Sequence, residues 1–207
     1  TLSLHDALPI YHPAEMIQEA YDAGQRIFGE SHVQELQQKH AILPDDIEWH
    51  FIGHLQTNKV KYIAPYISLI HAVDSPRLLN EINKQALRNG RQIRCLLQLH
   101  VAEEETKFGF TPEECMEYLR GGEFRNLQGV VISGIMCMAT NTDDEQRIRR
   151  DFSTANDFFQ QCCREFPELG ESMQFRSWGM SDDYRIAIEE GSNIVRIGSL
   201  IFGQRTY

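Results

Sequence analysis

Short apolar runs alternate with longer segments of helical periodicity along most of the chain. The runs are rich in β-branched and aromatic residues and are bounded by polar or glycine-containing turns, as strands are. Helix start and stop residues mark the segments between them: Pro13 opens one that ends before Gly24, and Thr111 opens another that ends near Gly121. The pattern predicts seven strands, over residues 26–29, 49–53, 69–73, 93–101, 130–135, 173–177 and 194–197.

This regular alternation of strand and helix predicts an α/β fold with a parallel sheet. The chain of 207 residues has no repeat of fixed length and no Gly/Ser-rich linker, which favours a single domain. A closed (β/α)8 TIM-type barrel and an open doubly wound sheet both fit the pattern. Because the first strand–helix turns lack the GxGxxG motif of dinucleotide-binding sheets, the barrel is favoured.

A barrel of this kind needs eight strands, so one more has to precede Pro13. Residues 1–10 show only a weak apolar alternation, with Asp6 and Pro9 where a buried strand should be continuously apolar. We therefore expect the first strand to be missing or non-native. The barrel would then have an open gap between its second and eighth strands, where unpaired N–H and C=O groups favour aggregation.

Charge and hydropathy restrict the partners of the chain. With 20 basic and 30 acidic side chains the formal charge is −10, which disfavours nucleic acids and anionic membranes as ligands. No apolar run reaches the roughly 18 residues of a membrane span, and no export signal opens the chain. We expect a soluble, cytoplasmic protein.

The spacing of cysteines and histidines gives no metal motif. The five cysteines include no CxxC pair and the eight histidines no HExxH, so neither a disulfide framework nor a zinc site is predicted. His50 and His54 flank the end of a predicted strand and could line a pocket, but alone they make a poor metal site. We predict reduced thiols and no metal.

Two turns rich in small residues carry the main chemical pattern. Gly179-Met180-Ser181 follows one predicted strand, and Gly198-Ser199 follows the next. If these strands are parallel neighbours, the turns lie side by side at the end of the barrel that carries ligands, with N–H groups that attract anions. They predict a site for a phosphate-bearing cofactor.

A series of motifs in fixed order extends this pattern over residues 11–207. The chain resembles the YggS/PROSC family of pyridoxal-phosphate homeostasis proteins, single-domain relatives of the alanine-racemase barrel. The set as a whole is far more specific than any one motif. The motifs are AGQR (23–26), FGE (28–30), VQE (33–35), WHFIGHLQTNK (49–59), VDS (73–75), KFGF (107–110), GIM (134–136), GMSDD (179–183), VRIG (195–198) and IFG (201–203).

The resemblance implies that pyridoxal 5′-phosphate (PLP) binds at the C-terminal mouth of the barrel. Ser181 and the turn of Gly198 and Ser199 would hold its phosphate. Arg196 would point at the pyridine nitrogen or the phosphate; the alternative for this residue is a surface salt bridge. The remaining candidates are Met180, Met136 and His50, as walls of the ring or simple packing, and Ser31, where relatives commonly carry asparagine.

The start of the chain departs from the family. Relatives carry the lysine that forms a Schiff base with PLP in a Ser-Lys pair, and the corresponding residues here are Pro9 and Ile10. Isoleucine cannot form a Schiff base, so no catalytic residue is predicted. Lys59, Lys61 and Lys107 are no obvious substitutes. We expect residues 1–10 to be foreign or altered, through a fusion or a mis-assembled reading frame, and residues 11–207 to form one PLP-binding domain; the alternative is a genuine relative that has lost the lysine.

The resemblance implies a protein of intracellular vitamin B6 homeostasis that stores PLP and delivers it to apo-enzymes, and that works as a monomer. Arg196 beside the pyridine nitrogen would keep that nitrogen unprotonated and weaken the ring as an electron sink, which favours a carrier over an enzyme. The alternative is a PLP-dependent, racemase-like enzyme, which would need the lysine and a second acid/base. A third possibility is a folded remnant that serves as an interaction surface.

Overall fold

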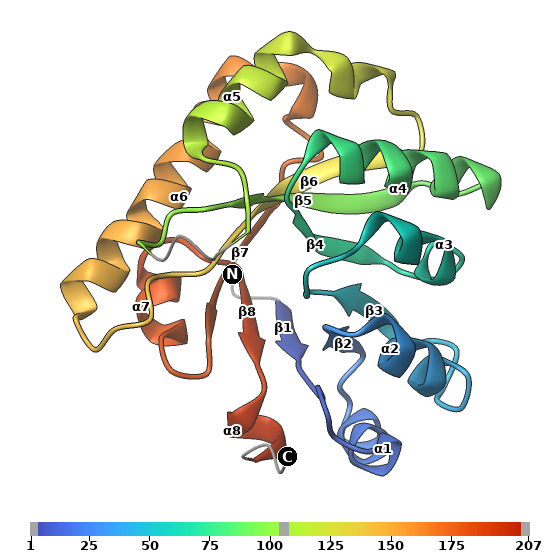
Figure 1. Cartoon of the computed structure of the whole chain (residues 1–207). Coiled ribbons are helices and arrows are strands. Elements are labelled where there is room, and N and C mark those ends of the chain that lie inside the picture. The colour runs from blue at the N-terminus through green and yellow to red at the C-terminus, as the bar shows by residue number, and fades with distance from the viewer. Residues whose placement is uncertain (1–3, 104–107, 204–207) are drawn as a thin grey trace.

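The computed structural model describes residues 4–103 and 108–203, so Lys107 of the KFGF motif lies outside the described residues. Eight parallel strands close into a barrel in sequence order, which confirms the predicted (β/α)8 architecture (Figure 1). The seven strands expected from the apolar runs are all present, with ends shifted by a few residues. The strands are β1 (Leu4–Ala7), β2 (Ile27–Glu30), β3 (Glu48–Phe51), β4 (Leu69–Val73), β5 (Ile93–Leu99), β6 (Val130–Cys137), β7 (Phe175–Met180) and β8 (Ile194–Ile197).

Helices follow the strands and surround the barrel (Figure 1). The predicted start at Thr111 is confirmed: its side chain accepts from the Glu114 N–H while Glu114 accepts from the Thr111 N–H, a capping box. The helices are α1 (Ala14–Asp22), α2 (Val33–His40), α3 (Val60–Ile63), α4 (Pro76–Arg88), α5 (Pro112–Gly121), α6 (Glu145–Glu165), α7 (Tyr184–Glu189) and α8 (Ser199–Phe202), with 3₁₀ turns η1 (Thr57–Lys59), η2 (Glu123–Asn126) and η3 (Pro167–Leu169).

The expected gap between the second and eighth strands is absent, and that expectation is wrong. Strand β1 pairs with β8 from Leu4↔Ile194 to Ala7↔Ile197, and with β2 at Ala7↔Phe28. The two residues that argued against a strand are both accommodated. Asp6 is buried with its Oδ2 3.0 Å from His50 Nδ1 and 3.2 Å from His71 Nε2. Pro9 comes after the strand ends, where it removes no ladder hydrogen bond.

Two apolar layers hold the barrel together. The larger lies between strands and helices and buries Trp49, Trp178 and Phe152. The smaller joins side chains of four different strands and is formed by Leu69, Leu96, Met136 and Ile194. No helix within residues 4–103 and 108–203 combines the length and the apolar character needed to cross a membrane.

Candidate functional site

The two glycine-containing turns lie side by side, as the sequence predicts. Strands β7 and β8 are parallel neighbours with Met180 opposite Arg196, and the Gly198 N–H donates to Ser181 Oγ at 3.2 Å. Only glycine fits position 179, because φ is +92° and a Cβ would lie 2.4 Å from the Ala187 Cβ. Ser181, Gly198 and Ser199 therefore cluster at the C-terminal mouth of the barrel.

Arg196 on β8 is buried at 2% exposure, so a surface ion pair, the alternative for this residue, is wrong. Its Nη1 donates to Ser177 O and to Ser177 Oγ, both at 2.7 Å, and its Nη2 donates to Cys137 O at 3.0 Å. These acceptors are neutral, and among the residues that the structure describes no carboxylate lies within ion-pair distance of the guanidinium. An arginine stays protonated even when buried. The site thus contains a fixed positive charge without a countercharge in contact.

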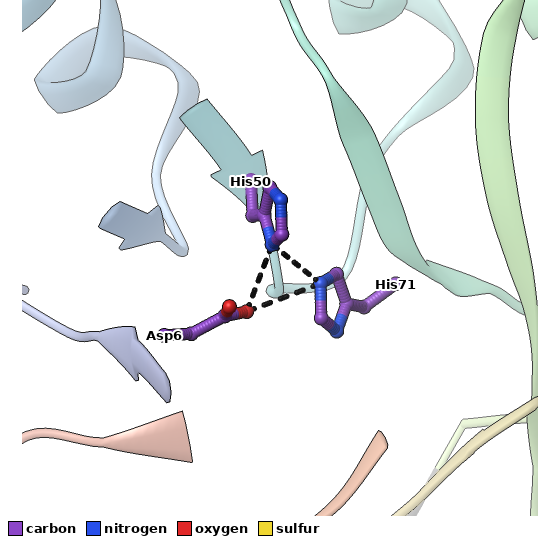
Figure 2. A group of neighbouring side chains, drawn as sticks. All are labelled: Asp6, His50 and His71. Carbon is purple, nitrogen blue, oxygen red and sulfur yellow. Dashed lines mark hydrogen bonds and ion pairs between the residues drawn. The ribbon is translucent and has the colours of Figure 1, made fainter. Parts of the chain in front are cut away.

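A chain of polar side chains continues from Arg196 across the barrel. Ser177 Oγ lies 2.9 Å from His71 Nδ1, and His71 Nε2 lies 3.1 Å from His50 Nδ1. Asp6 Oδ2 is 3.0 Å from His50 Nδ1 and 3.2 Å from His71 Nε2. Figure 2 shows these three side chains pointing at one another from β1, β3 and β4. Because Ser177 accepts from Arg196, its own O–H is available to His71.

Burial and the opposite charges set the protonation states of this cluster. Burial opposes the charge on His50, but Asp6 and Glu48 raise the pKa of His50 to about 9. Burial lowers the pKa of His71 to about 3, so this imidazole is neutral at pH 7. Although burial disfavours the carboxylate, His50 and His71 hold the pKa of Asp6 below its ordinary value. The cluster is therefore a carboxylate–imidazolium pair with a neutral second imidazole.

The same three residues offer ligand atoms within 4.8 Å of one another, a spacing that a metal ion could use. Each of the facing atoms is already within hydrogen-bond or ion-pair distance of another member of the cluster. The prediction that the protein holds no metal stays a prediction.

The remaining predicted residues lie in different surroundings. Met136 packs in the small apolar cluster with Leu69 and Leu96, which is the core role that the sequence left open. Met180 ends β7 at 40% exposure. Ser31 follows β2 with its hydroxyl 3.0 Å from His32 Nδ1, and Ile10 is buried in the loop after β1.

Sequence reasoning missed His71, Ser177 and Asp6 as members of the site. His71 carries a usable signal, because it is the polar residue in the otherwise apolar run Leu69–Val73. A polar side chain at such a position needs a partner inside the barrel. The sequence does not reveal which partner, since Ser177 lies 106 positions further along the chain.

Comparisons with known proteins identify a matching family model and similar proteins. The model of the family "Alanine racemase, N-terminal domain" matches residues 10–206. The chain is 40% identical over 199 residues to the pyridoxal phosphate homeostasis protein of Aquifex aeolicus, covering 94% of this chain and 84% of that protein.

Solved structures with the same fold superpose on most of this chain. PipY of Synechococcus elongatus PCC7942 without PLP superposes with a TM-score of 0.91 at 34% identity, covering 98% of this chain and 93% of that one. PipY with PLP bound superposes with a TM-score of 0.86 at 33% identity, covering 96% and 92%. Alanine racemase of Clostridium difficile 630 shares the fold alone, with a TM-score of 0.74 at 13% identity over 100% of this chain and 52% of the racemase.

Proposed function

This chain belongs to the YggS/PROSC family of pyridoxal phosphate homeostasis proteins, and from that premise we propose that it binds PLP at the C-terminal ends of β7 and β8. The observation that carries the proposal is the buried Arg196 guanidinium, which donates to the neutral oxygens of Ser177 and Cys137, together with the joined turns of Ser181 and Gly198. A buried cation without a carboxylate in contact favours an anionic or electron-rich ligand.

The residues of the mouth fit the two ends of PLP. Ser181 Oγ, the Gly198 N–H and Ser199 supply hydroxyl and amide donors for a phosphate dianion. Arg196 would face the pyridine nitrogen, with Met180 and His50 beside the ring and Ser31 at the neighbouring strand end. When bound, PLP can act as an electron sink, and an arginine that donates to the ring nitrogen keeps that nitrogen unprotonated. The site therefore suits holding the cofactor.

Attachment of PLP through a lysine is not available at position 10. Ile10 stands there, so binding by this chain would be noncovalent and reversible. We also propose that residues 1–10 are foreign or altered and that residues 11–207 form the PLP-binding domain. One observation supports this: the family match begins at residue 10.

Storage of PLP and its delivery to apo-enzymes in the cytoplasm, by a monomeric carrier, is the function that this site supports best. The relatives are named as homeostasis proteins, and PipY binds PLP. The racemase-like alternative has support only from the shared fold. It would also need a lysine at position 10, where this chain has Ile10.

The proposal is tested by adding PLP to the chain and to its Ile10→Lys variant. Visible absorption, borohydride reduction and peptide mass mapping then report covalent attachment, and an amino-acid racemisation assay reports turnover. We expect saturable, reversible binding by the unmodified chain, and a covalent adduct at residue 10 only in the variant. That result would also support the loss of the native lysine from residues 1–10. We expect no racemisation by either protein.

Three outcomes would contradict the proposal. A reduced adduct in the unmodified chain would show that another lysine reacts with PLP. Racemisation by the Ile10→Lys variant would favour the enzyme. Absence of PLP binding by both proteins would support the folded-remnant alternative.

A further inference from the structure

A buried ion cluster lies outside the proposed PLP contacts. Lys39 of α2 has a side chain only 7% exposed, and its Nζ donates to Glu30 Oε1 at the end of β2 and to Glu35 Oε1 at 2.6 Å. Burial of Glu30 outweighs the nearby lysine and raises the pKa of this carboxyl to about 7. Burying the charges of Lys39 and Glu30 is costly, and stability alone does not explain such a cluster.

Two hydrogen bonds connect this cluster to the loop between β1 and α1. Lys39 Nζ also donates to Pro9 O at 2.7 Å, and the Tyr11 N–H donates to Glu35 Oε1 at 2.7 Å. The cluster therefore holds the backbone immediately before and immediately after Ile10. Both contacts are made to main-chain atoms, so they do not depend on which side chain residue 10 carries.

The loop has a conformation that needs such support. Tyr11 has φ of +63°, the only positive φ of a non-glycine residue in the described chain. A non-glycine residue in this conformation is strained and persists only where its surroundings hold it. The His12 N–H donates to Pro9 O at 2.9 Å and closes the turn, so Pro9 O accepts from both His12 and Lys39.

We propose that Lys39 and Glu35 form a clamp that fixes the backbone on both sides of position 10, and so presents the side chain at that position to the mouth of the barrel. The inference rests on the proposed PLP site. Lys39 and Glu35 are positioning residues: they touch the loop, and the residue at position 10 would touch the cofactor. Loss of the clamp should impair attachment at position 10 more than it impairs the phosphate contacts of Ser181 and Gly198.

The test uses two clamp variants in the full chain. Lys39→Met removes the ammonium and keeps a long apolar stem. Glu35→Ala removes the acceptor of the Tyr11 N–H and leaves Lys39 paired with Glu30, so it carries the test if Lys39→Met does not fold. Lys61→Met, an exposed lysine of α3, is the matched control.

Three readouts separate positioning from general damage. Amide exchange at Tyr11 is measured without PLP. The rate of covalent attachment is measured in the Ile10→Lys background from the visible absorption. Noncovalent PLP affinity is measured in the Ile10 background. We expect both clamp variants to speed exchange at Tyr11 and to slow attachment by about tenfold each, which corresponds to about 1.4 kcal/mol. Noncovalent affinity should stay within about twofold, and Lys61→Met should change nothing.

The clamp is overturned if the folded variants attach PLP at the parent rate, or if noncovalent affinity falls by the same factor as attachment. An Ile10→Lys parent that forms no adduct would count against the proposed function. In that case the rate of amide exchange at Tyr11 in the PLP-free chain still tests the clamp proposal. Unchanged exchange in both variants overturns the proposal, and faster exchange supports it.

Discussion

At the scale of single residues, the charge pair of Asp6 and His50 should dominate the pH dependence of stability in alkaline solution. The pKa of His50 is raised from 6.5 to about 9, so the folded state holds a proton that the unfolded state releases. The stabilisation is complete below pH 6.5 and is lost as the pH rises towards 9. At about 1.4 kcal/mol per unit, this contributes at most on the order of 3 kcal/mol.

Asp6→Asn keeps the shape of the side chain and removes its charge. We expect the pKa of His50 to fall to its ordinary value or below it, because burial then acts with less opposition. The decline in unfolding free energy between pH 7 and 9 should flatten accordingly. Histidine NMR titration and denaturant unfolding at several pH values measure both effects, with the exposed Asp45→Asn as control. Titration of His50 near pH 9 in the Asp6→Asn variant would contradict the assignment.

From the sequence, only those residues of the candidate site that stand at strand ends could be brought together. Ser181, Gly198 and Arg196 stand at strand ends, so their convergence follows from the parallel pairing of two consecutive strands. The network through His71 and Ser177 could not be predicted in the same way, since it depends on which side chains meet across the closed barrel. The clamp shares this limit, because Lys39 reaches Pro9 across 30 positions.

At the scale of elements, strands β6 and β7 approach closely at Gly134. A Cβ at this residue would lie 1.9 Å from Phe175 O, a backbone atom of the neighbouring strand, in a pair that belongs to the barrel ladder. Backbone cannot give way as the end of a flexible side chain can. Gly134→Ala should therefore disturb the pairing of β6 with β7 and destabilise the protein by about 3 kcal/mol.

Urea unfolding measures this effect, and Gly121→Ala is its control. Gly121 ends α5, and a Cβ there would meet no heavy atom within 4 Å. The control should be neutral or slightly stabilising, by up to about 1 kcal/mol, since alanine favours a helix over glycine. Equal midpoints for the two variants would show that β6 and β7 can separate at no cost.

Strand β1 shows why this element was misjudged from its sequence. Hydrophobic periodicity found the seven other strands, because their apolar faces pack against helices or the barrel interior. The polar Asp6 counted against a strand, yet it is paired with His50 of β3 and His71 of β4. In the barrel, β2 separates these two strands from β1. A pattern rule that scores each residue alone cannot include a partner supplied by the tertiary fold.

At the scale of the whole molecule, closure of the barrel depends on very few backbone pairs between β1 and β2, which we call the β1–β2 seam. Strand β1 pairs with β2 at a single register position, Ala7↔Phe28, whereas β5 and β6 pair at seven positions from Ile93↔Val130 to Leu99↔Cys137. Fewer ladder positions mean fewer hydrogen bonds and a lower free energy of local opening. The closed barrel has no sheet edge, but opening of this seam would create two.

We therefore expect native-state hydrogen exchange to be fastest in the barrel at β1 and at the facing side of β2. Peptides covering Leu4–Ala7 should lose protection at least about tenfold sooner than those of β5 and β6. Mass spectrometry of exchange at neutral pH measures this, with the amides of α4 as an internal reference for a well-packed helix. Equal protection of β1 and β5 would mean that the four pairs with β8, and not the single pair with β2, govern closure.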